Sequence, residues 1–109
     1  MALIHAQPFD VISLKPLAEK IHEVKTHSLL KTGHLQLMRL VMPAGQTMPR
    51  HDVAGEITIQ CLEGSVLITT PGRSAALTAG EMMALPAREP HGLEALADSS
   101  LLVTVLLKT

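Results

Sequence analysis

The chain has 109 residues, with 9 basic and 10 acidic side chains and a formal net charge of −1. This length predicts one domain, spanning residues 1–109. The balanced charge and a single residue of the Phe, Trp and Tyr class, Phe9, argue against a nucleic-acid partner, which would need a basic surface and stacking side chains. The longest apolar run is far shorter than a membrane span, so we expect no membrane contact.

The N-terminal part, residues 1–32, predicts short strands and one short helix. An apolar alternation over residues 8–14 (PFDVISL) indicates an opening strand, and residues 16–23 (PLAEKIHE) are typical of one or two helical turns. Residues 24–30 and 34–42 then predict two strands, which are joined by a turn at Gly33.

The remainder, residues 33–107, contains short apolar segments separated by Gly and Pro turns. These segments predict further strands at residues 56–62, 65–70, 74–78, 81–85, 91–96 and 101–107. Many short strands at this spacing predict an all-β sandwich or barrel.

Alternation within the strands separates an apolar face from a polar one. His51, Val53, Ile57, Ile59 and Cys61 fall on one face, which we interpret as an inner wall with one polar group. Glu56 falls on the opposite face unless a bulge near Gly55 turns it inward.

Two groups of spaced residues carry a family resemblance. Gly45 and His51, with Gly64 at the end, match parts of G-x5-H-x-H-x(3,4)-E-x6-G, and Gly80, Pro86 and His91 match parts of G-x5-P-x-G-x2-H-x3-N. In these spacings the chain resembles the cupin superfamily, which implies a single-domain double-stranded β-helix, or jelly-roll barrel.

The resemblance also implies where a metal would bind. The four ligand positions of metal-binding cupins fall at His51, Val53, Ile57 and His91, so a valine and an isoleucine replace two ligands. Structural zinc takes four protein ligands and catalytic zinc usually three, so the site is incomplete. Glu56 is the lesser candidate for a replacement ligand, and Cys61 or Met48 would favour a soft ion.

This pattern is compatible with three functions, of which a structural dimer without a ligand is disfavoured because a pure scaffold needs no pair of inward histidines. The first is a binding module, in which a small organic ligand enters an apolar pocket formed by His51, His91, Val53, Ile57, Ile59, Cys61 and Met48. It would hold no cofactor, or a weakly held Zn, Ni, Fe or Cu ion. The alternative is a metal-dependent enzyme of the dioxygenase, isomerase or decarboxylase type, with His51, His91 and Glu56 as ligands; neither the residues nor the resemblance assigns catalytic residues.

Composition also bears on assembly and compartment. Apolar residues make up 47% of the chain, and this surplus predicts a homodimer. The N-terminus lacks the pattern of a signal peptide, and the one cysteine, Cys61, allows no intrachain disulfide. We therefore expect a cytoplasmic protein.

Overall fold

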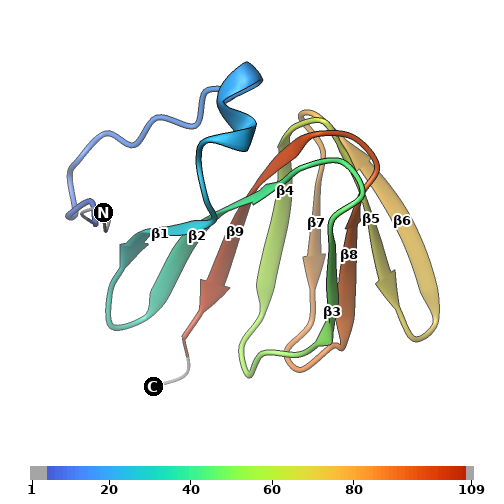
Figure 1. Cartoon of the computed structure of the whole chain (residues 1–109). Helices are drawn as coiled ribbons and strands as arrows, with labels where there is room; N and C mark the ends of the chain where they lie inside the picture. Colours follow the sequence, from blue (N-terminus) through green and yellow to red (C-terminus); the bar gives the residue numbers. More distant parts are fainter. Residues whose placement is uncertain (1–4, 108–109) are drawn as a thin grey trace.

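The computed structural model describes residues 5–107, and these residues form two antiparallel sheets packed face to face (Figure 1). The first sheet has the strand order β1-β2-β9-β4-β7. Its strands are β1 (His27–Lys31), β2 (Leu35–Met42), β9 (Ser99–Leu106), β4 (Ile57–Glu63) and β7 (Met82–Leu85). The second sheet has the order β3-β8-β5-β6, with β3 (Thr47–His51), β8 (His91–Ala95), β5 (Ser65–Thr70) and β6 (Arg73–Thr78). The chain crosses repeatedly between the sheets, which is the predicted jelly-roll arrangement.

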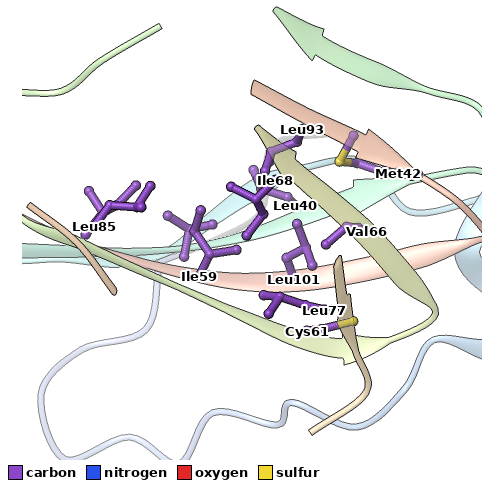
Figure 2. Packing of buried hydrophobic residues seen from close by; sticks show 13 residues of the cluster. Leu40, Met42, Ile59, Cys61, Val66, Ile68, Leu77, Leu85, Leu93 and Leu101 are labelled. Carbon is purple, nitrogen blue, oxygen red and sulfur yellow. The ribbon is translucent and has the colours of Figure 1, made fainter. Parts of the chain in front are cut away.

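The core lies between the sheets and is built by strand alternation. In β4, Ile57, Ile59 and Cys61 are buried while Thr58 and Gln60 are only half-buried, as the period of two requires. Facing side chains from the second sheet fill the space opposite, and Figure 2 shows Val66, Ile68, Leu77 and Leu93 from that sheet in the same cluster. Burial of each large apolar side chain contributes about 1.5–3 kcal/mol to folding.

One strand of the second sheet, β3, was not predicted as a separate element. It contains Pro49, which cannot donate a ladder hydrogen bond, and four of its five residues are exposed. The strand lies at the edge of its sheet, where a proline is tolerated because one side of the strand needs no partner.

The N-terminal expectations were partly wrong. Residues 8–14 form no strand, although Ala6 N donates to Leu29 O at 2.8 Å. The predicted helix is a short 3₁₀ turn, η1 (Ala18–His22), with Ile21 as its buried residue. A turn at residues 8–9, where Phe9 has a φ of +80° and Asp10 N donates to Gln7 O, interrupts the apolar alternation of residues 8–14, so it does not become β structure.

The turn between β4 and β5 depends on Gly64. Its φ is +83°, and a Cβ there would lie 2.2 Å from the carbonyl oxygen of Asp98. Both the left-handed backbone and this close approach require glycine. Within residues 5–107, no helix is long and apolar enough to cross a membrane.

Candidate functional site

The two histidines of the resemblance lie at one end of the sandwich. His51 ends β3, and His91 begins the neighbouring strand β8. Figure 1 shows that the end of β7 and the start of β4 lie at this same end. The β3–β8 register shifts between Met48 and His51, after which His51 and His91 are direct partners across the ladder. Direct partners in an antiparallel pair project to the same face, so the two imidazoles meet.

The two rings are close and are held in the same way. Their centroids are 4.6 Å apart with an interplanar angle of 52°. Nδ1 of His51 lies 3.2 Å from Pro49 O, and Nδ1 of His91 lies 2.9 Å from Glu89 O. A carbonyl oxygen only accepts, so each Nδ1 carries the proton and donates it. In the neutral rings each Nε2 is then a hydrogen-bond acceptor, and neither Nε2 has a protein partner among residues 5–107.

The two rings differ in exposure. His91 is 4% exposed, whereas His51 is exposed at the edge of the sheet. The pair therefore has one buried and one open member.

The other two positions of the metal motif are apolar in space as well as in sequence. Val53 is half-buried in the β3–β4 loop, and its carbonyl accepts a hydrogen bond from Arg88 N at 2.9 Å. Ile57 is 4% exposed and belongs to the core cluster. Neither side chain can donate electrons to a metal ion.

The residues considered as replacement ligands do not complete the set. Glu56 is exposed, and Gly55 before it serves a close approach, since a Cβ there would lie 1.9 Å from Leu106 O. In the part of the chain that the structure describes, no three His, Cys, Asp or Glu side chains gather as a metal-binding group. Two imidazoles are fewer donors than structural or catalytic zinc uses, so the residues present do not fit a resident metal.

Cys61 and its neighbours are core residues. Cys61 is fully buried, and its Sγ lies 3.4 Å from Glu63 O, to which the thiol donates. Burial raises the pKa of the Cys61 thiol, against a smaller lowering by that hydrogen bond, so the group behaves as a small apolar side chain. Ile59 is buried in the same cluster, and Met48 packs against it half-buried.

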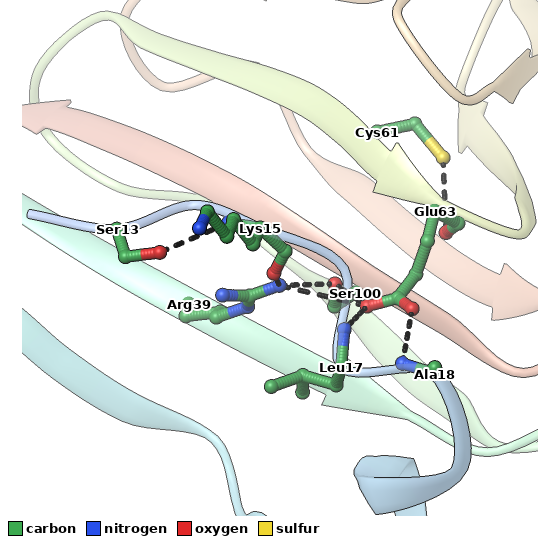
Figure 3. Close-up of polar contacts among 8 residues, drawn as sticks. All are labelled: Ser13, Lys15, Leu17, Ala18, Arg39, Cys61, Glu63 and Ser100. Atoms are coloured by element: carbon green, nitrogen blue, oxygen red, sulfur yellow. Dashed lines mark hydrogen bonds and ion pairs between the residues drawn. The ribbon is translucent and has the colours of Figure 1, made fainter.

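A buried polar group on the outer side of the first sheet was not predicted (Figure 3). The carboxylate of Glu63 accepts hydrogen bonds from Leu17 N at 2.8 Å, from Ala18 N at 2.9 Å and from the hydroxyl of Ser100. A guanidinium nitrogen of Arg39 lies 3.5 Å from the same carboxylate. These contacts fasten the N-terminal segment to the sheet. The sequence showed Glu63 only as a turn residue, because its partners lie more than 20 positions away.

A hollow of about 390 Å³, also missed in the sequence, opens between the β5–β6 hairpin and β7. It is lined by Ile68, Thr70, Gly72, Arg73, Ser74, Ala75, Met83, Ala84, Leu85, Pro86 and Glu89. None of the seven predicted pocket residues lines it. Its position depends on the order of the strands, because β6 and β7 are edge strands of the two sheets and lie on the same side of the sandwich. The sequence pattern alone does not give this order.

Comparisons with known proteins match the fold alone. No family model matches the chain, and no curated protein sequence matches it. A conserved protein of unknown function from Streptococcus pyogenes is 21% identical, with a TM-score of 0.77 over 100% of this chain and 96% of that one. A cupin superfamily protein from Desulfitobacterium hafniense is 17% identical, with a TM-score of 0.77 over 99% of each chain.

A third similar structure supports the same conclusion. An RmlC-like cupin from Desulfovibrio desulfuricans is 20% identical, with a TM-score of 0.70 over 95% of this chain and 96% of that one. At these identities the likeness concerns the course of the backbone and carries no activity across.

Proposed function

We propose that this chain, which has the double-stranded β-helix fold of the cupin superfamily, binds a small organic molecule at the His51–His91 pair. The observation that carries the proposal is the shared orientation of the two rings. Each donates Nδ1–H to a carbonyl two residues earlier in the chain, and each leaves Nε2 free among the described residues. Fixed tautomers of this kind pre-orient two acceptors, which favours a ligand that carries hydroxyl or amine donors.

The surroundings of the pair support binding at the end of the barrel rather than deep inside it. Met48 and Val53 are half-buried and pack against the core, so they supply apolar contact beside the rings. Ile57, at the start of β4, is buried at this end of the sandwich, and Ile59 and Cys61 are buried further along the same strand. An apolar surface with a few fixed polar groups is the usual composition of a small-molecule site.

The metal-dependent alternative has less support. The described residues supply two imidazole donors and no third, so a Zn, Ni, Fe or Cu ion at this pair would be held weakly. The proposed protein therefore works without a resident metal, and the two histidines act as hydrogen-bonding groups.

The proposal includes the assembly and the compartment. Phe9 and Val11 are fully exposed on the N-terminal segment, and covering such side chains is a reason for a homodimer. Cys61 is a free, buried thiol, which suits a cytoplasmic protein because thiols stay reduced there. Small-molecule binding needs neither a nucleic acid nor a membrane as partner.

The test is side-chain NMR of the histidines in protein labelled with nitrogen-15. We expect His51 and His91 to show the Nδ1–H tautomer, and members of a hydrogen-bond-donor fragment library to shift both Nε2 signals. The variant His51→Gln should weaken this binding, while His34→Gln, a matched exposed histidine in a turn, should not. If fragments bind His51→Gln and His91→Gln with the same affinity as the wild type, the proposal is refuted.

A further inference from the structure

We propose that the hollow between the β5–β6 hairpin and β7 binds a small monocarboxylate with an apolar body. The inference rests on the proposed function in that it assumes a ligand-binding cupin. It concerns other residues, however, and it names the chemical class of the ligand. A volume of about 390 Å³ lies in the range of small-ligand sites.

The floor of the hollow is apolar and closed. Ile68 of β5 is 1% exposed and Leu85 of β7 is 6% exposed, so both are held in place by the core beneath them. Met83 is half-buried beside them, and its flexible side chain can adapt to an apolar ligand. The small side chain of Ala75, which faces inward with Ile68 across the β5–β6 ladder, leaves the space open.

Arg73 supplies a positive charge at the rim. The two ion pairs among residues 5–107 are His22–Asp98 and Arg39–Glu63, so Arg73 has no carboxylate partner in the described chain. The backbone carbonyl of Arg73 accepts a hydrogen bond from the Thr70 hydroxyl at 2.9 Å, which fixes the hairpin that presents the guanidinium. A guanidinium without a partner matches a carboxylate through two parallel hydrogen bonds.

Glu89 limits the charge that the hollow accepts. It lines the same hollow from the β7–β8 loop and is half-buried. A second carboxylate on the ligand would meet this like charge, so a dicarboxylate is disfavoured. One arginine and one glutamate over an apolar floor therefore select a monocarboxylate.

The hollow lies at the same end of the barrel as the histidine pair. Thr69 pairs with Gly92, so continuing the register by one residue places Thr70 beside His91. Thr70 in turn pairs with Arg73. The histidine pair, Thr70 and Arg73 therefore form a row across the four-stranded sheet, and a ligand in the hollow lies next to the site of the proposed function.

The experiment is a titration followed by backbone amide NMR, with hexanoate as the probe. Hexanamide removes the charge at equal length, and adipate adds a second carboxylate. The variants are Arg73→Gln, Arg73→Lys, Ala75→Leu and Glu89→Gln, each checked for an unchanged fold by its spectrum. Arg73 is exposed, so its replacement should leave the fold intact.

We expect hexanoate to shift the amides of the β5–β6 hairpin and β7, and hexanamide to bind at least about tenfold more weakly. Arg73→Gln should lower the affinity for hexanoate about tenfold or more, with Arg73→Lys between, and Ala75→Leu should abolish binding by filling the hollow. Glu89→Gln should admit adipate.

Two results would overturn the inference: no shifts with hexanoate, or binding that survives both Arg73→Gln and Ala75→Leu. The double variant His51→Gln/His91→Gln separates the two proposals. Hexanoate binding that persists in it supports this hollow independently. Hexanoate binding that is lost in it but kept in Arg73→Gln would support the histidine site and refute this one.

Discussion

Replacing Glu63 by alanine tests the account of how the N-terminal segment is held. The substitution removes the acceptor for Leu17 N, Ala18 N and the Ser100 hydroxyl, and it leaves Arg39 without its counterion. The side chain of Arg39 is 6% exposed and that of Glu63 is 14% exposed, so water replaces these contacts only in part. Breaking a buried pair by removing one partner costs about 3–5 kcal/mol. The remaining exposure of Glu63 places the expected loss near the lower end, about 3 kcal/mol.

The assay is reversible unfolding, followed by heat and by urea. In a domain of this size a loss of about 3 kcal/mol lowers Tm by about 15 °C. Hydrogen exchange should accelerate at the amides of Leu17 and Ala18 before the rest of the chain. Glu94→Ala is the matched control, because Glu94 is an exposed glutamate on β8, and it should change stability little.

Two results would refute this reasoning. A Tm within a few degrees of the wild type would show that Glu63 does not hold Arg39 and the N-terminal segment. Unchanged hydrogen exchange at the amides of Leu17 and Ala18 would show that Glu63 does not hold these two residues in place. The double variant Arg39→Met/Glu63→Leu should recover only the part of the loss that comes from the unpaired charge of Arg39, because leucine does not restore the acceptor for Leu17 N, Ala18 N and Ser100.

The same carboxylate predicts a pH dependence. Partial burial by itself would raise the pKa of Glu63, but hydrogen bonds from Leu17 N, Ser100 and Ala18 N, together with the charge of Arg39, lower it overall. Its stabilisation is therefore fully present above the ordinary glutamate pKa of about 4.3, and it is lost as the pH falls through the lower pKa of the folded state. Glu63→Gln should flatten the fall in stability that begins as the pH drops below about 5.

Three further predictions concern the turn, the ligand positions and the assembly. Gly64→Ala should lower the free energy of unfolding by more than about 2 kcal/mol, because a Cβ at φ +83° meets Asp98 O. Denaturant titration checks this, and an unchanged denaturation midpoint contradicts it. The double variant Val53→His/Ile57→Glu should be less stable than the wild type without metal, because Ile57 is buried. Added Zn²⁺ or Ni²⁺ should raise the melting temperature of this variant in a thermal-shift assay. If metal raises it no more than in the wild type, the ligand positions implied by the resemblance are wrong. Phe9→Asp with Val11→Asp should shift the proposed dimer toward monomer in sedimentation analysis, and an unchanged dimer would place the interface elsewhere.

The strands were predictable where the apolar alternation is continuous and the turns contain Gly or Pro. The predicted strand at residues 65–70 matches β5 in full, and Ile57, Ile59 and Cys61 are buried as the alternation required. The edge strand β3 was missed because Pro49 interrupts the pattern of a strand; in the structure the β3–β8 register shifts at this point, between Met48 and His51, and the pairing then continues. Local pattern alone could not reveal this, since the position of a strand in its sheet depends on distant partners.

The candidate site was predictable only in part. The family spacing placed His51 and His91 together, and the structure brings their rings to 4.6 Å. Ring tautomers depend on carbonyls of the folded backbone, so the two free Nε2 atoms could not be predicted. The contacts of Arg39 with Glu63, and the position of Arg73 beside a hollow, depend on register between strands that are distant in sequence.

Metal content tests the central claim most directly, because the proposed ligand site uses the two histidines without a resident metal. Purified, untagged protein and its His51→Ala variant would be analysed by plasma mass spectrometry for Zn, Ni, Fe and Cu per subunit. The account predicts far less than one metal ion per subunit in both proteins. About one ion per subunit in the wild type, lost in His51→Ala, would contradict it and show that a further ligand completes the site.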